Sequence, residues 1–216
     1  MDTTFPPVLS QKMQKELMSV LHPRIREFSK GELIMEKEPV ENRLCLLLKG
    51  TAYLWIENEH ASKQLLDFFM KGDFFCYEML PAAPNCHCFI QAKYHCSIAY
   101  LSPTDITEYV TSNPSDELGS FFRNIFHSII TSQNEHCHML QQKSIRDKLL
   151  AFLHYQAALQ NTAHLQMPIP YSDLADYLTI DRSAMMTELT KMHADGLIRK
   201  ELHSIQLLTK KTQQTL

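Results

Sequence analysis

The feature that most constrains this chain is a change of hydrophobic period at Ser102-Pro103. Before it, apolar residues form short or alternating runs, such as Leu44–Leu48 and Ala52–Ile56, separated by turn-forming Gly, Pro and Asn. After it, apolar residues recur at helical spacing almost to the end of the chain. Many short strands followed by a series of helices indicate an antiparallel β-structure and then a helical region, and they exclude an alternating α/β sheet.

The strand-rich part is predicted to be a sandwich, roll or barrel of antiparallel strands. Its further runs are Ile25 and Phe28, Leu33–Met35, Gln64–Phe69, Phe89–Ala92 and Ser97–Leu101. Gly50 and Gly72 fall between runs, where a tight turn requires a positive φ. A short amphipathic helix that begins at Ser10, a plausible N-cap, is expected ahead of the strands.

A long helix is predicted from about Asn113 to about Ser144. One stripe of it is apolar, and its residues are Leu118, Phe122, Ile125 and Ile129. Because this apolar arc is broad for a surface helix on a small barrel, we expect it to bury against a second copy of the chain. Packing on its own barrel is the alternative that the sequence leaves open.

The last part of the chain contains two short amphipathic helices joined by a tight turn, within Ile169–Ile198. Ser172 is the expected N-cap of the first. A further helix, Ile145–Gln160, precedes them, and the polar residues 161–168 are expected to form a loop. Arg199–Leu208 is predicted to form a short hairpin. Helix, turn, helix and hairpin in this order make a winged helix, whose second helix can enter the major groove of DNA.

Composition limits the classes of function. The net charge of −3 excludes a protein that is basic as a whole, so a DNA-binding surface must be local. The chain does become basic from Lys191 onward. No apolar run approaches the roughly 20 residues of a membrane span, and the first residues lack the pattern of a secretory signal. We therefore expect a soluble cytoplasmic protein whose six cysteines are thiols.

Three segments resemble the Crp/Fnr superfamily of bacterial transcription regulators. LADYLTIDRSAMMTELTKMHADGLI is similar to the family's recognition segment, IRDKLLAFL to the segment that leads into the DNA-binding domain, and MKGDFFCYEML to a Gly-Asp-hydrophobic stretch of the sensor barrel. The resemblance covers roughly residues 20–208. It implies an α+β fold with an N-terminal antiparallel β-roll or jelly-roll sensor domain of the cyclic-nucleotide-binding type (1–112), a dimerisation helix (113–144) and a C-terminal winged helix–turn–helix (145–216).

The resemblance also implies a homodimer on a pseudo-palindromic double-stranded DNA operator, with RNA polymerase as a further partner. The residues expected to contact DNA are Ser172, Arg182, Ser183, Met186, Thr187, Lys191, Arg199 and Lys200. Arg182 suits the O6 and N7 atoms of guanine, although an ion pair with Asp181 would also explain it. Many relatives carry arginine at the position of Thr187, so the operator is expected to differ from the family's usual half-site.

The sensor domain lacks the phosphate cassette that cyclic-nucleotide binders of the family carry. No arginine lies between Arg43 and Arg123, so a buried cyclic phosphate would have no counter-charge, and cyclic nucleotides are disfavoured. The candidate effector pocket comprises Gly72, Phe74, Phe75, Cys76, Glu78, Cys86, His87 and Cys88. The cofactor stays unassigned. Metal, haem or thiol redox chemistry at Cys86, His87 and Cys88 is one alternative, and an unidentified small-molecule effector, or no effector, is the other. No metal ligands are assigned, because the CxC spacing is not that of structural zinc.

Two other classes of function were weighed. A ligand-binding or protein-interaction module with a degenerate winged helix would agree with the net charge of −3 and the missing arginine. An enzyme would need a nucleophile–base or carboxylate pair in a cavity, and the clustered His/Glu motif of a cupin-like metalloenzyme is missing. We therefore expect a regulator and no enzyme.

Overall fold

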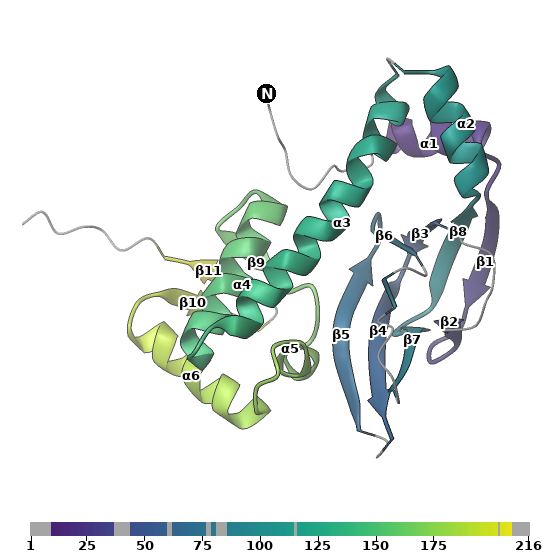
Figure 1. Cartoon of the computed structure of the whole chain (residues 1–216). Coiled ribbons are helices and arrows are strands. Elements are labelled where there is room, and N and C mark those ends of the chain that lie inside the picture. Colours follow the sequence, from purple (N-terminus) through teal and green to yellow (C-terminus); the bar gives the residue numbers. More distant parts are fainter. Residues whose placement is uncertain are drawn as a thin grey trace, which may run out of the picture. The chain divides into compact units, whose positions relative to one another are not determined.

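The computed structural model describes residues 10–36, 44–59, 62–76, 79–80, 86–114, 116–202 and 204–208, without the side chains of Phe126 and Ser128 (Figure 1). The chain forms two compact units, Met1–Ile130 and Thr131–Leu216. The division falls inside the long helix α3 (Glu117–Gln141), which the sequence analysis had set apart as residues 113–144. Of the helices that the structure describes, none has the length together with the apolar composition of a membrane span.

The first unit is built on two antiparallel sheets. Its strands are β1 (Arg24–Phe28), β2 (Leu33–Glu36), β3 (Leu44–Lys49), β4 (Thr51–Asn58), β5 (Lys63–Met70), β6 (Phe74–Cys76), β7 (Cys86–Ala92) and β8 (Cys96–Leu101). Within the described residues one sheet has the order β1-β8-β3-β6 and the other β2-β7-β4-β5. The predicted roll of antiparallel strands is therefore present, and its strands match the apolar runs of the sequence.

The turn between β3 and β4 depends on Gly50. Its φ is +92°, and a Cβ atom placed there would lie 2.2 Å from the carbonyl oxygen of His95. Only glycine permits this approach of two backbones. The neighbouring Cys96 is fully buried and its thiol donates to the carbonyl oxygen of Thr51 at 3.2 Å, so this cysteine is a core residue, as its strand pattern indicated.

Two complete helices and the first part of α3 complete the first unit. Helix α1 (Gln11–Val20) is capped by Ser10, as predicted, whose hydroxyl accepts the N–H of Met13 at 3.1 Å. Helix α2 (Pro103–Ser112) begins after Ser102. At the start of α3, the Asp116 carboxylate accepts the N–H of Leu118 at 3.0 Å and the hydroxyl of Tyr109 at 2.8 Å. This carboxylate therefore caps α3 and joins it to α2.

The apolar stripe of α3 is buried mainly inside the first unit. Leu118, Phe122 and Ile125 are at most 3% exposed and belong to the same core as the strands. The ring of Phe122 lies 6.4 Å from that of Phe74 on β6. Packing on the chain's own roll, the alternative that the sequence left open, accounts for these three residues. Ile129 is partly buried and packs against the same core.

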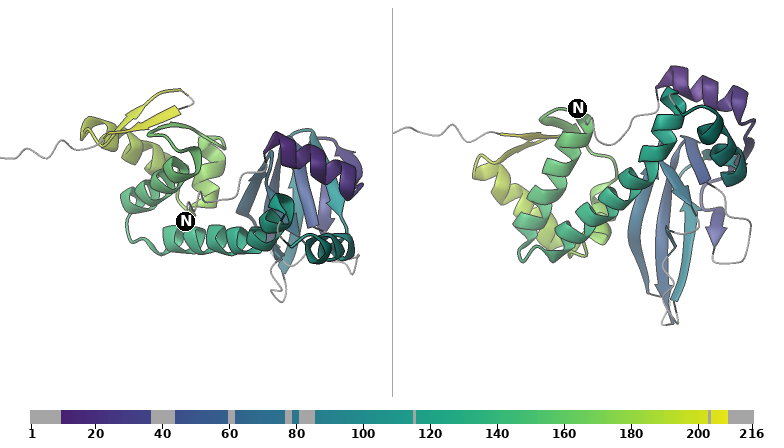
Figure 2. Two further views of the ribbon diagram at one scale, coloured as in Figure 1. Left: turned by 90° about the horizontal axis from the view of Figure 1, so that it is seen from above. Right: turned by 45° about the horizontal axis from the view of Figure 1, so that its top comes forward.

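The second unit is a helical domain with a small sheet. Its elements are the end of α3, α4 (Ile145–Gln160), β9 (His164–Gln166), α5 (Tyr171–Tyr177), α6 (Arg182–Ala194), β10 (Ile198–Lys200) and β11 (Ser204–Leu207). The strands pair in the order β10-β11-β9, and Figure 2 shows β10 and β11 as adjacent strands at the yellow end of the chain. The predicted wing is therefore present, whereas the predicted loop over 161–168 contains the short strand β9 (His164–Gln166), which was not expected. Leu165 alone of that strand is buried, too short a pattern to detect.

Candidate nucleic-acid interface

Helix α6 has one face in the core of the second unit and one face in solvent. Met185, Leu189 and Met192 are fully buried at helical spacing, as predicted. Asp181 caps the helix, since its carboxylate accepts the N–H of Ala184 at 2.8 Å. This geometry turns the opposite face outward, and the exposed residues there are Arg182, Ser183, Thr187, Thr190 and Lys191. Met186 is half-buried beside them.

The turn between α5 and α6 contains a residue in an unfavourable conformation. Thr179 has a φ of +53°, a region that β-branched residues rarely adopt. The ammonium group of Lys148, on α4, donates to the carbonyl oxygen of Leu178 at 3.0 Å and to the hydroxyl of Thr179 at 3.3 Å. A lysine from a third helix thus holds the turn that sets the angle between α5 and α6. Lys148 was not among the predicted site residues.

A second brace comes from the end of α3. The His136 ring stacks on Tyr177 of α5 with centroids 3.8 Å apart and planes 7° apart, and its Nε2 lies 3.0 Å from the Tyr177 carbonyl oxygen. Burial lowers the pKa of His136, while that hydrogen bond opposes the shift. Tyr177 in turn meets Phe152 of α4 edge to face at 6.2 Å. The helix that precedes α6 is therefore fixed from two sides within the second unit.

Ser172 does not occupy the position predicted for it. Helix α5 begins at Tyr171, with Pro170 at the N-cap and no side-chain cap. Ser172 lies inside the first turn, half-buried, and its hydroxyl donates to the carboxylate of Asp173 at 3.1 Å. The prediction of Ser172 as N-cap was wrong because Pro170, with its fixed φ, occupies the N-cap two residues earlier than the hydroxyl suggested.

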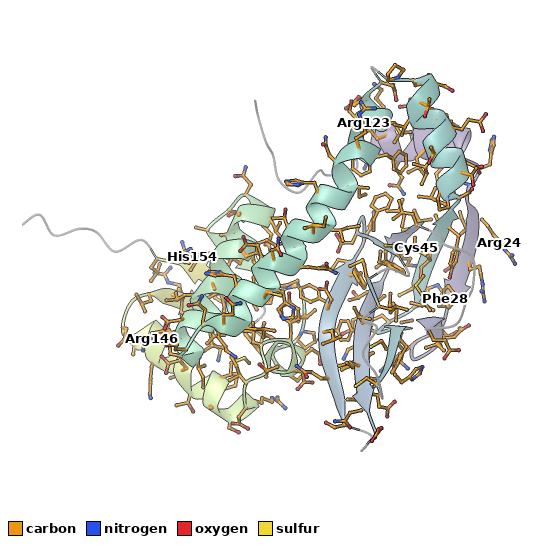
Figure 3. All side chains as sticks on the ribbon, in the orientation of Figure 1. Arg24, Phe28, Cys45, Arg123, Arg146 and His154 are labelled. Carbon is orange, nitrogen blue, oxygen red and sulfur yellow. The ribbon has the colours of Figure 1, made fainter. Side chains whose placement is uncertain are left out.

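The acidic residues around α6 are paired with a single arginine. Arg146 on α4, labelled in Figure 3, binds the Glu188 carboxylate through Nε at 2.5 Å and the Asp195 carboxylate through Nη1 at 2.7 Å. These two hydrogen bonds, that to Glu188 first, raise the pKa of Arg146 above its ordinary value. Arg182, by contrast, forms no ion pair with any described residue, since Asp181 uses its carboxylate as a cap. Arg182 and Lys191 on the outward face of α6 are therefore exposed cations without an ion-pair partner among the described residues.

The threonine hydroxyls of α6 are partly used within the helix. Thr187 donates to the carbonyl oxygen of Ser183 at 2.9 Å, and Thr190 to that of Met186 at 3.0 Å. In this state each hydroxyl can accept a hydrogen bond from a base or solvent while its methyl group faces outward. Thr190 was missed by the sequence analysis, although it lies one turn beyond Met186.

The two cationic residues of the wing differ in their surroundings. Arg199 on β10 is exposed and lies opposite Gln206 in the register of the hairpin. The Nζ atom of the half-buried Lys200 lies 5.5 Å from the centre of the Tyr171 ring at the start of α5. Burial raises the pKa of Tyr171, whose hydroxyl is enclosed and has no hydrogen-bond partner among the described residues. Arg199 is therefore the wing cation that faces solvent.

The predicted effector-pocket residues of β6 fill the core of the sensor unit. Phe74, Phe75 and Cys76 are at most 7% exposed, and the Phe75 ring stacks on Phe69 at 4.9 Å. Gly72 lies in the turn before them at a φ of +97°. Glu78, the remaining residue of this segment, lies outside the described residues.

Cys86, His87 and Cys88 alternate along β7. Cys88 is fully buried and Cys86 half-buried, whereas His87 is exposed and its Nε2 lies 3.4 Å from the Glu36 carboxylate. Because adjacent strand residues point to opposite faces, the histidine and the two cysteines do not converge. In the part of the chain that the structure describes, no group of three His, Cys, Asp or Glu side chains is placed to hold a metal ion.

The inner face of the sensor sheet carries a carboxyl group that sequence reasoning missed. Asp67 lies opposite Leu54 at a register shift between β4 and β5 and shares the face that buries Leu54 and Phe69. Its carboxylate accepts only the N–H of the adjacent Phe68, at 2.8 Å, among the described residues. Burial, with a smaller contribution from Asp73, raises the pKa of Asp67 to about 7. The sheet of the first unit therefore carries a largely buried carboxyl group.

Comparison with solved structures identifies the fold. A cyclic nucleotide-binding domain containing protein from Listeria monocytogenes EGD-e matches with a TM-score of 0.72 at 11% identity, over 91% of this chain and 97% of that one. A CooA variant from Carboxydothermus hydrogenoformans gives 0.66 at 19% identity, over 96% and 92% of the two chains. A protein from Eubacterium rectale assigned to the crp/fnr family of transcriptional regulators gives 0.53 at 16% identity, over 97% and 96%.

No protein-family model matches the sequence, and no curated protein does. The chain nevertheless has the fold of the Crp/Fnr transcription regulators, with a strand-rich sensor domain and a winged helix–turn–helix. This result confirms the fold that the sequence predicted.

Proposed function

We propose that this protein is a sequence-specific DNA-binding transcription regulator of the Crp/Fnr type. The observation that carries the proposal is the outward face of α6, where Arg182 and Lys191 are exposed while Arg146 forms ion pairs with Glu188 and Asp195. A helix with this face, on a winged helix–turn–helix scaffold, suits the major groove of DNA. A local basic surface also suits a chain whose net charge is −3.

The residues of α6 take different roles in this proposal. Arg182, at the first helical position, donates both arms of its guanidinium to O6 and N7 of a guanine. Ser183 and Thr187 offer short polar contacts, and the half-buried Met186 presents its side chain to a thymine methyl group. Lys191, two turns further along the helix, neutralises a backbone phosphate, as does Arg199 on the wing.

The regulator is proposed to act as a homodimer on a pseudo-palindromic operator, with one α6 in each half-site. Helix α3 is the proposed contact with the second copy, but through residues other than its buried stripe. His127, Ile130, Asn134 and Cys137 recur at spacings of three and four residues and are exposed. Ile130 is 56% exposed, and a polar Asn at such a seam favours one register and one oligomeric state.

The sensor domain is proposed to respond to something other than cyclic AMP or cyclic GMP. Two observations support this: the sequence has no arginine between Arg43 and Arg123, and the inner sheet face carries Asp67, a carboxyl group that supplies no positive charge for a phosphate. A small-molecule effector of different charge, contact with RNA polymerase and a cytoplasmic location belong to the same proposal.

The test is selection of binding sites from random double-stranded DNA with the full-length protein. The proposal expects an enriched pseudo-palindrome whose half-site centres are about one helical turn, or a multiple of it, apart. Binding should weaken steeply as salt rises. Failure to enrich any sequence at low salt would contradict the proposal and favour a protein-interaction module.

On the selected operator, Arg182→Ala should lower specific affinity by about 1–3 kcal/mol and relax the preference for one guanine. Arg24→Ala is the matched control, because it removes the same charge from an exposed position on β1 of the other unit (Figure 3). Equal operator affinities for the two variants would show that Arg182 does not contact the bases.

A further inference from the structure

The tip of the wing carries an apolar residue that the hairpin does not require. Strands β10 and β11 pair up to Lys200 opposite Ile205, and the N–H of Glu201 donates to the carbonyl oxygen of Ser204 at 2.9 Å. Leu202, in the connection between them, is 81% exposed, more than any other large apolar residue described. Tight hairpin loops favour Asn, Gly and Asp for conformational reasons. Neither the turn nor the core therefore accounts for a leucine at this position.

The hairpin beneath Leu202 is firmly held. Ile205 is fully buried, and β11 is flanked on its other edge by β9, which pairs Ile205 with Leu165. The acidic residue beside the tip is tied to its own hairpin, because the Ser204 hydroxyl donates to the Glu201 carboxylate at 2.6 Å. His164 on β9 lies 3.7 Å from the same carboxylate. The wing thus presents an exposed apolar side chain on a hairpin held by backbone pairing, and the adjacent Glu201 carboxylate is engaged.

We propose that Leu202 is a wedge that enters the minor groove of the operator and partly unstacks one base step there. The inference rests on the proposed DNA-binding function. Leu202 follows Arg199 by three residues on the same hairpin, and the unit to which the hairpin belongs also exposes Arg182 and Lys191 on α6. These positive charges suit a polyanion such as DNA. The apolar surface that DNA offers to a leucine is the face of a base step.

Leucine is among the side chains that proteins insert between base steps from the minor groove, kinking the duplex toward the major groove. Pyrimidine–purine steps such as TA and CA/TG unstack most easily. The wedge therefore predicts a preference for a flexible step at a fixed distance from the guanine that Arg182 reads. A protein partner seated on Leu202 is the competing occupant, and it predicts no effect on DNA.

The test uses the selected operator with 2-aminopurine placed in turn at the steps flanking each half-site. With the full-length protein, fluorescence should rise at one position, because 2-aminopurine brightens when it is unstacked. Leu202→Ala should abolish that rise, reduce the bend measured by end-to-end energy transfer, and weaken binding by about tenfold, with the dependence on salt unchanged. Arg199→Ala should instead reduce the salt dependence by about one phosphate contact and keep the fluorescence rise.

Folding is not in question for these variants, since the largely exposed Leu202 makes little contact, and equal thermal midpoints will verify this. An Leu202→Ala protein that binds and unstacks the operator like the wild type overturns the wedge. If Arg182→Ala loses specificity in the same experiment, the proposed function stands without it. A wild-type protein that selects no DNA overturns the proposed function itself, and the wedge with it.

Discussion

Replacing Asp67 by Asn should change how the stability of the sensor unit depends on pH. Asp67 shares the buried sheet face with Leu54 and Phe69, and burial raises its pKa from its ordinary 3.8 to about 7. Between these two values the folded protein holds a proton that the unfolded chain has released. The free energy of unfolding therefore decreases as the pH rises, and the decrease stops once the pH passes the folded-state pKa.

The size of the effect follows from the same shift. One pKa unit corresponds to about 1.4 kcal/mol, so the two units between pH 5 and pH 7 give an upper limit of about 2.7 kcal/mol. The Asp67 side chain is not fully shielded from solvent, so we expect roughly half of that, or about 1.3 kcal/mol. Asparagine has a similar shape and does not titrate, so the variant should lack this dependence.

Urea unfolding followed by tryptophan fluorescence measures the difference. The single tryptophan, Trp55, lies on β4 of the same sheet, so its emission reports this unit. The stability of the wild type relative to Asp67→Asn should fall between pH 5 and pH 7 and then level off. Glu59→Gln, at an exposed position after β4, is the control for the loss of one carboxyl group. Parallel curves for wild type and Asp67→Asn would refute the buried-carboxyl argument.

Two further substitutions test the helices. Thr179→Gly should raise the thermal midpoint and stabilise the second unit by about 1 kcal/mol, because glycine accepts the φ of +53° without strain. A lower midpoint would mean that the lost hydrogen bond between Lys148 and the Thr179 hydroxyl outweighs the relief of strain. Ile130→Asp should yield a folded monomer, because Ile130 is 56% exposed on α3, whereas Ile125→Asp should disrupt folding because Ile125 is 3% exposed. Size-exclusion chromatography with circular dichroism separates these results, and an Ile130→Asp dimer would move the contact elsewhere.

The parts of the fold that depend on local sequence pattern could be predicted from the sequence. The spacing of Met185, Leu189 and Met192 placed the buried face of α6 correctly, because helix periodicity fixes which side chains share a face. Ser10 was recognised as a cap for the same local reason. Strand β9 escaped recognition because it is held by backbone pairing to β11, which leaves no trace in side-chain pattern.

What the sequence could not supply are contacts between elements distant in the chain. The stripe through Phe122 was visible, but only the position of Phe74 on β6 shows that its own roll already covers it. From the sequence, Lys148 looks like a solvated helix residue. Only the structure shows that its ammonium group binds the carbonyl oxygen of Leu178 at the turn. From the sequence, Asp67 looks like an ordinary polar residue of a strand. Only the register of the strands, which pairs it with Leu54, shows that it lies on the inner face. Burial and partner identity are tertiary properties, so periodicity alone does not contain them.

The ion pairs of Arg146 bear on how a chain with a net charge of −3 could present the proposed DNA-binding face. In the proposed function, α6 packs on one side and contacts DNA on the other, so an acidic residue near the DNA side would repel phosphate. Glu188 lies between the two faces. One guanidinium from α4 binds Glu188 and Asp195 together, which engages two acids of this helix and its C-cap and holds α6 against α4. The field near α6 depends on its own exposed charges, which include Arg182 and Lys191, and not on the net charge of the whole molecule. Because exposed charges are screened beyond about 10 Å at ordinary salt, a phosphate at the helix would respond to that local field rather than to the net charge.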